Sequence, residues 1–198
     1  MLRINLVLSL LVWFLCSFNN YILNFYVKYM PGNVFLNTII IGSAELFAKA
    51  ISGLIFRFAG LKRGMVGLAA YTIVVGVIFL FLRSSEAVIP VLVLLARLAT
   101  GSLYNGIFYS AVILFPTHLT ATANGISNAS GRLGAVLSPL AAELPGALPL
   151  SLFIGIAFSS LVVSSLFIVK NKEETDKATL SEEDIMEMTR IKKTEESQ

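Results

Sequence analysis

Six long apolar segments, separated by short gaps, dominate this sequence. A helix that crosses a bilayer needs about 20 mainly apolar residues, and each segment has roughly that length. The short gaps leave room only for antiparallel connections between neighbouring helices. The sequence therefore predicts an all-α membrane protein with a six-helix transmembrane bundle at 1–170 and a charged tail at 171–198. The expected helices cover residues 5–27, 34–56, 65–83, 88–113, 121–143 and 149–169.

The composition argues against a soluble domain. Of the 198 residues, 56% are hydrophobic and only 14% are charged, whereas soluble domains are about 45–50% apolar and about 25% charged. A soluble protein of this size could not bury so much apolar surface in one core. The net charge is +3, but the basic residues form no patch. The expected surroundings are therefore a lipid bilayer, and nucleic acid is not an expected partner.

The residues needed for common kinds of catalysis and metal binding are scarce. Cys16 is the only cysteine and His118 the only histidine, so neither a disulfide nor a two-histidine metal site can form within the chain. No nucleophile–base pair or glycine-rich phosphate loop is recognisable. We expect no enzyme activity, no metal and no cofactor.

The lysines and arginines outside the apolar segments indicate the orientation. Such residues are enriched in cytoplasmic connections. With alternating helices, six of these residues lie at one end of the bundle and two at the other, which predicts that both termini are cytoplasmic. The larger group is Arg3, Arg57, Lys62, Arg63, Lys170 and Lys172, and the smaller group is Lys28 and Arg83.

The tail differs from the rest of the chain, because residues 170–198 carry six basic and nine acidic residues. The run from Ser181 to Asp184 resembles a helix N-terminus with a capping pattern. A short helix there could place Leu180, Ile185, Met188 and Ile191 on one face. The alternative is a solvated, largely disordered tail.

Four charged residues lie well inside the apolar segments: Glu45, Lys49, Arg97 and Arg132. Charges at membrane depth are costly and usually face a bundle interior or an aqueous cavity. All four fall within one or two turns of the expected midplane. This convergence predicts a polar cavity, and its excess of positive charge would attract anions.

Each charge also has a structural explanation. Glu45 and Lys49 are four residues apart and could neutralise each other on one helix. Arg97 could extend its guanidinium toward the interface. Arg132 has no acid in its own segment before Glu143, which makes it the strongest ligand candidate.

Polar and aromatic residues recur beside these charges at helical spacing. One stripe holds Asn124, Asn128 and Arg132; a second holds Arg97, Gly101, Tyr104, Asn105 and Phe108; a third holds Trp13, Cys16, Asn20 and Asn24. Rings beside cations and amides suit a ligand with an aromatic ring and a carboxylate, although amides also join membrane helices by hydrogen bonds. The predicted substrate-binding residues are Arg132, Arg97, Lys49, Glu45, Asn20, Tyr104, Asn105, Asn128 and Trp13.

The fifth segment is rich in small residues, which allow helices in a membrane to approach closely. Pro139 would bend or weaken the same helix near its end. The small residues are Gly125, Ser127, Ala129, Ser130, Gly131 and Gly134.

Five stretches carry recognisable motifs in a fixed order: Trp13 to Phe18, Gly32 to Asn37, Glu45 to Lys49, Leu114 to Thr117 and Ser130 to Leu140. In order and spacing they resemble the C-terminal half of the major facilitator superfamily, in its organic cation/anion transporter family. The resemblance covers about residues 2–170 and implies the seventh to twelfth helices of a twelve-helix fold. It further implies a plasma-membrane transporter of small organic solutes that works by alternating access.

At the charged positions the chain is similar to the anion-transporting branch of that family. That branch has an acid and a lysine four residues apart, as at Glu45 and Lys49, a basic residue as at Arg97, and an arginine as at Arg132. The cation-transporting branch tends to have an aspartate at the last position. The resemblance thus implies organic anions as substrates.

The sequence also departs from the family pattern. The family has a glutamate where this chain has Ile113 and an arginine where it has Thr120, and the stretch 57–64 keeps the family's loop motif only in part. Glu45 is followed by Leu46 and Phe47 rather than by a residue and a proline. The resemblance implies that the missing glutamate and arginine belong to cytoplasmic contacts that latch one conformation of the transporter, which puts normal gating in doubt.

The resemblance includes no counterpart of the family's first six helices, which leaves two interpretations. The chain is half of an organic anion transporter, with a missing N-terminal half or a second copy as its partner. The alternative is a non-transporting membrane scaffold or regulatory protein derived from a transporter half.

Overall fold

A computed structural model of the chain describes residues 2–29, 33–82 and 88–168, and these residues are helical apart from short connections. The prediction of an all-α fold is therefore confirmed. The predicted tail at 171–198 lies outside the described residues. The elements are α1 (Leu2–Tyr26), a 3-10 turn (Val27–Tyr29), α2 (Val34–Leu82), α3 (Ile89–Leu114), α4 (Thr117–Ala142) and α5 (Leu148–Ser165).

Within the described residues, four helical segments are long and apolar enough to cross a membrane, rather than the six predicted. They are Leu2–Tyr29, Val34–Leu82, Ile89–Leu114 and Leu148–Ser165. Helix α4 is long enough to cross a membrane, but its many small and polar residues lower its mean hydropathy. The second and third predicted helices are joined in α2.

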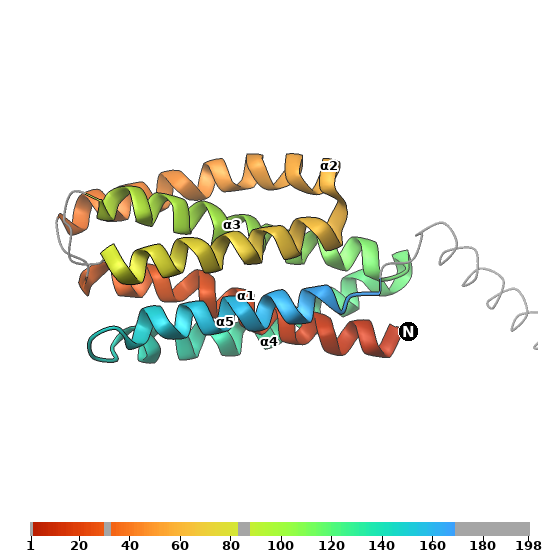
Figure 1. The fold of residues 1–198 in the computed structure, drawn as a ribbon. Coiled ribbons are helices and arrows are strands. Elements are labelled where there is room, and N and C mark those ends of the chain that lie inside the picture. The colour runs from red at the N-terminus through yellow and green to blue at the C-terminus, as the bar shows by residue number, and fades with distance from the viewer. Residues whose placement is uncertain (1, 30–32, 83–87, 169–198) are drawn as a thin grey trace, which may run out of the picture.

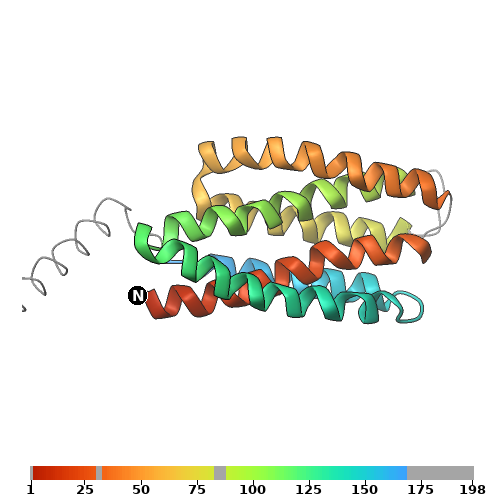
Figure 2. The ribbon, with the colours of Figure 1, turned by 180° about the vertical axis from the view of Figure 1, so that it is seen from behind.

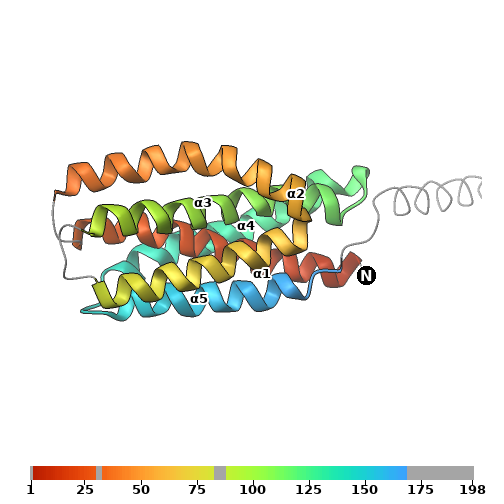
Figure 3. The ribbon, with the colours of Figure 1, turned by 45° about the horizontal axis from the view of Figure 1, so that its top comes forward.

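Helix α2 contains 49 residues and reverses direction at Gly60, which has φ 75° and ψ 171°. A straight helix of that length would extend about 70 Å, more than twice the thickness of the hydrocarbon core. In Figures 1 and 3 one arm instead runs out and the other runs back, and α3 lies between them over part of their length. The prediction of a loop at 57–64 is therefore wrong, because one glycine makes the reversal and helix continues on both sides of it.

We expect Gly60→Ala to destabilise the bundle. Almost only glycine adopts a positive φ with an extended ψ, and other residues pay about 1–3 kcal/mol there. The measurement is thermal or denaturant unfolding in one fixed detergent. Gly67→Ala in the same helix is the matched control, because it has ordinary helical geometry and a new Cβ would meet no atom within 4 Å. Equal stability of the two variants would show that the reversal does not require glycine.

The helices form an elongated bundle with two distinct ends (Figures 1 and 2). Helix α2 packs mainly on α3, α1 mainly on α4, and α5 on α2 and α1. The N-terminus, the reversal at Gly60 and the α3–α4 connection lie at one end. The predicted clustering of Arg3, Arg57, Lys62 and Arg63 at one end agrees with this arrangement.

Two apolar clusters form the interior of the bundle. One contains Phe79 and Phe153, and the other contains Trp13, Met65 and Ile107. The outer surface is also apolar, and phenylalanines such as Phe35 and Phe58 are 82% exposed. Large apolar side chains exposed in this number are suited to lipid rather than to water.

Candidate functional site

Arg97 of α3 lies at the centre of a polar contact that joins three helices. Its side chain is only 2% exposed. Its Nη2 donates to Oε2 of Glu45 in α2 at 2.9 Å. Its Nη1 donates to two acceptors of Asn20 in α1, the backbone oxygen at 2.7 Å and Oδ1 at 2.8 Å. Three of the predicted site residues therefore come together, and the positive charge of Arg97 is balanced by Glu45.

Glu45 pairs with Arg97 and not with Lys49, the partner that its sequence spacing suggested. The spacing of Glu45 and Lys49 suggested a pair on one helix, but the carboxylate instead bonds to Arg97. Lys49 is exposed, and among the described residues it has no carboxylate partner. Nη1 and Nη2 of Arg97 are thus committed to protein acceptors, whereas its buried Nε has no hydrogen-bond partner among the described residues.

A pocket of about 510 Å³ opens between the first arm of α2 and α3. Its volume is within the range of about 300–1,000 Å³ typical of small-molecule sites. Of the described residues, two cations and no carboxylate line it, and the rings of Phe56 and Tyr109 stack there with centroids 5.6 Å apart. This lining can attract an anion and hold an aromatic ring. The lining residues are Lys49, Ser52, Gly53, Phe56, Arg57, Asn105 and Tyr109.

Only Lys49 and Asn105 of this pocket were predicted from the sequence. The others could have been found by extending the same helical stripes. Ser52, Phe56 and Arg57 follow Lys49 at intervals of three, seven and eight residues, and Tyr109 follows Asn105 by four. These spacings place each group on one helix face.

A cluster of aromatic rings lies between α1 and α3. Trp13 makes edge-on contacts with Phe108 at 4.7 Å and with Tyr104 at 6.3 Å, and Tyr104 contacts Phe108 at 5.6 Å. Tyr21, which the sequence prediction missed, lies 6.5 Å from Tyr104. Trp13 is fully buried, and within residues 2–29, 33–82 and 88–168 its Nε1 has no hydrogen-bond partner. Trp13 is therefore an interior packing residue that supports the rings of Tyr104 and Phe108.

Helix α4 carries the predicted stripe of Asn124, Asn128 and Arg132. Both asparagines are half-buried and Arg132 is exposed. Arg132 lies close enough to interact electrostatically with Tyr104, whose hydroxyl also interacts with Tyr21. No carboxylate pairs with Arg132 in the part of the chain that the structure describes. Arg132 is therefore an unneutralised cation beside the aromatic cluster.

The nine predicted residues thus fall into three groups. Arg97, Glu45 and Asn20 form the buried contact; Lys49 and Asn105 line the pocket; and Trp13, Tyr104, Asn128 and Arg132 belong to the aromatic cluster and the α4 stripe. No group of three His, Cys, Asp or Glu residues that could hold a metal is found within the described ranges.

Comparison with curated proteins gives several transporters. Solute carrier family 22 member 7 of Rattus norvegicus is 31% identical over 179 residues, which is 87% of this chain and 32% of that protein. The Bos taurus protein of the same name is 29% identical over 177 residues, 87% of this chain and 31% of that protein. Organic anion transporter 3 of Oryctolagus cuniculus is 29% identical over 140 residues, 70% of this chain and 26% of that protein. No protein-family model matches the chain.

The long apolar helices and these relatives define a multi-pass α-helical membrane protein. The chain is a relative of the organic anion transporters of solute carrier family 22, which confirms the family resemblance seen in the motifs. These relatives are named as solute carriers or transporters, and none is named as an enzyme. The chain spans about a third of the length of the solute carrier family 22 member 7 relatives it matches.

Proposed function

We propose that this chain forms the C-terminal six-helix half of a major facilitator transporter and that the complete transporter moves small organic anions by alternating access. The names of its relatives support transport of organic solutes. The two arms of α2, 34–59 and 61–82, are each long enough to span a bilayer, and so is α4 with 26 residues. Together with α1, α3 and α5 they supply the six spans.

The balance of charges carries the proposed preference for anions. Arg97 and Glu45 cancel in one ion pair at 2.9 Å. The cations that remain at mid-depth are Lys49 and Arg132, and no described carboxylate pairs with either of them. Uncompensated positive charge in a low-dielectric cavity attracts anions and repels cations.

The proposed mechanism assigns separate tasks to these groups. Arg132 offers a planar guanidinium that can bind a carboxylate through two parallel hydrogen bonds. Lys49 adds a point charge, and Asn105 and Asn128 supply amide groups. The rings of Tyr104 and Tyr109 provide apolar faces for an aromatic substrate. Rocking of this half against an N-terminal half, or against a second copy, would open the cavity to each side in turn.

In the proposed orientation both termini lie in the cytoplasm. The proposed location of the transporter is the plasma membrane. Support comes from the clustering of Arg3, Arg57, Lys62 and Arg63 at one end of the bundle (Figure 1). Lysines and arginines near the ends of spans favour the cytoplasmic side.

We expect Arg132 to control anion uptake. The test replaces the matching third of the rat relative with residues 2–168 of this chain and measures uptake of benzoate and of benzylamine. Arg132→Ala should reduce benzoate uptake about tenfold or more, because a charge-assisted hydrogen bond contributes about 1.5–3 kcal/mol. Arg132→Lys should retain the charge but weaken uptake, and Arg132→Asp should abolish it.

Lys62→Ala is the matched control, since it removes an exposed cation near the reversal of α2 and should leave uptake unchanged. All variants must first be shown to reach the membrane in equal amounts. Unchanged benzoate uptake by Arg132→Ala would remove Arg132 from the site. Preferential uptake of benzylamine would overturn the anion preference, and no uptake by an inserted chimera would favour the non-transporting scaffold.

A further inference from the structure

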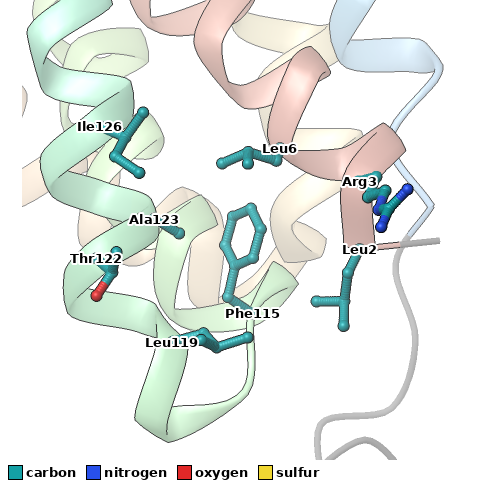
Figure 4. Close-up of a pocket in the computed structure, with 8 residues that line it drawn as sticks. All are labelled: Leu2, Arg3, Leu6, Phe115, Leu119, Thr122, Ala123 and Ile126. Carbon is teal, nitrogen blue, oxygen red and sulfur yellow. The ribbon is translucent and has the colours of Figure 1, made fainter.

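A second pocket, of about 170 Å³, lies where α1 and α4 begin (Figure 4). It is smaller than typical ligand sites of about 300–1,000 Å³, which suits it to single side chains. Its walls are apolar, with Leu6 and Ile126 on two sides and Phe115 between them, and Arg3 lies at its edge. Leu2, Leu119 and Ala123 complete the apolar lining.

The chain leaves the bundle beside this pocket. Asn5 of α1 holds the backbone of Ile168 by two hydrogen bonds, from its Nδ2 to the Ile168 oxygen at 2.9 Å and from the Ile168 nitrogen to its Oδ1 at 3.3 Å. The neighbouring Phe167 is buried in the apolar cluster that contains Trp13, Met65 and Ile107, which holds the same segment against the bundle. The tail therefore starts within one helical turn of Leu2 and Leu6. Twelve extended residues can span about 40 Å, so residue 180 can easily reach the pocket.

The tail sequence contains a complete helix-start pattern. Ser181 is suited to the N-cap position and Asp184 to the third helical position, where its carboxylate can accept from the N-cap backbone. Leu180 and Ile185 occupy the two positions of a hydrophobic staple. Ile185 and Met188 would then lie on one face, three residues apart.

We propose that residues 180–191 of the tail dock on this pocket, with Ile185 and Met188 inserted between α1 and α4. The charges are complementary, because Glu182, Glu183 and Asp184 in the first turn would lie close to Arg3. Residues 170–198 carry nine acidic and six basic residues, and the end of the bundle that the tail leaves carries an excess of exposed cations. The docked segment would bridge α1 and α4 at the end of the bundle. This proposal does not depend on the chain being a transporter.

Photo-crosslinking identifies the occupant of the pocket directly. We expect full-length chain in lipid nanodiscs, with benzoylphenylalanine at Leu119, to crosslink to its own tail on irradiation. Trypsin would release the tail as the peptide 178–190, which mass spectrometry can detect in the adduct. The same photoreactive residue at Phe158, which is 59% exposed on α5, is the positional control and should not capture this peptide.

Variants test the register of docking. Ile185→Asp and Met188→Asp should each reduce the crosslink about tenfold, because a carboxylate is poorly accommodated in an apolar slot. Met186→Asp, on a different face, is the matched control and should leave the yield unchanged. Arg3→Glu should reduce the yield about two- to fivefold, as expected for a partly exposed charge contact.

The other outcomes overturn the proposal. A lipid adduct at Leu119 would show that an acyl chain occupies the pocket. When isotope-labelled and unlabelled chains are mixed, a mixed adduct would show that the tail comes from a second copy. No adduct, or equal yields from Ile185→Asp and Met186→Asp, would show that the tail does not dock through this face.

Discussion

Glu45→Ala is expected to lower the free energy of unfolding by about 3 kcal/mol, because it leaves the guanidinium of Arg97 buried without a counter-charge. Asn20 would still accept from Nη1, but Nη2 would lose its partner. The side chain of Arg97 is 2% exposed and that of Glu45 is 42% exposed, so the stranded charge is the buried one and the expected cost lies at the low end of the range for a broken buried pair. The measurement is reversible unfolding in a mixed detergent, followed by tryptophan fluorescence from Trp13.

Two controls separate the stranded charge from other effects. The double variant Glu45→Ala with Arg97→Met should recover most of the stability, because an apolar side chain of similar length needs no partner. Glu143→Ala breaks the ion pair between Lys28 and Glu143, whose side chains are 52% and 59% exposed respectively. This variant should cost less than about 1 kcal/mol. Equal losses for Glu45→Ala and Glu143→Ala would show that burial does not strengthen the Arg97 contact.

Gly134→Ala is expected to force α1 and α4 apart and to destabilise the bundle by about 1–3 kcal/mol. A Cβ at this position would lie 2.5 Å from the backbone oxygen of Phe14 and 3.2 Å from the backbone nitrogen of Phe18. Because both atoms belong to the main chain, no side-chain rotation can relieve the overlap. Thermal unfolding and hydrogen exchange of the α1 amides would measure the effect.

Gly125→Ala in the same helix is the matched control, since a new Cβ there meets no atom within 4 Å. Alanine is also a better helix former than glycine, so the control should be neutral or stabilising by about 0.5–1 kcal/mol. If both variants behave alike, the close approach of α1 and α4 does not depend on Gly134.

The helix positions were predictable because long apolar segments have few alternatives in a bilayer. The segments expected at 5–27 and 88–113 correspond closely to α1 (Leu2–Tyr26) and α3 (Ile89–Leu114). The reversal at Gly60 was not predictable in the same way. Arg57, Lys62 and Arg63 indicate where apolar sequence ends, but lysine and arginine are good helix formers, so they do not indicate where helix ends.

The site was predictable in its residue types but not in its partners. Glu45 and Arg97 were identified from their depth in apolar sequence, and so were the cations that remain unpaired. Spacing along one helix favoured Lys49, four residues away, as the partner of Glu45. That spacing contains no information about how α2 is rotated toward α3, so it could not reveal Arg97 as the partner. The acceptors of Asn20 also come from another helix, and one of them is a backbone oxygen that no side-chain pattern can reveal.

The reversal at Gly60 acts as a rigid elbow. Only one residue departs from helical geometry there, and a Cβ placed at Gly64 or Gly106 would collide with the ring of Phe56, which fills the space beside the elbow. A flexible loop would let the two arms of α2 move independently along the bundle axis. A reversal made by one residue instead couples the displacement of one arm along that axis to the other arm. Tilting of the first arm is therefore expected to carry the second arm with it, and within α2 the reversal offers a protease no loop to cut.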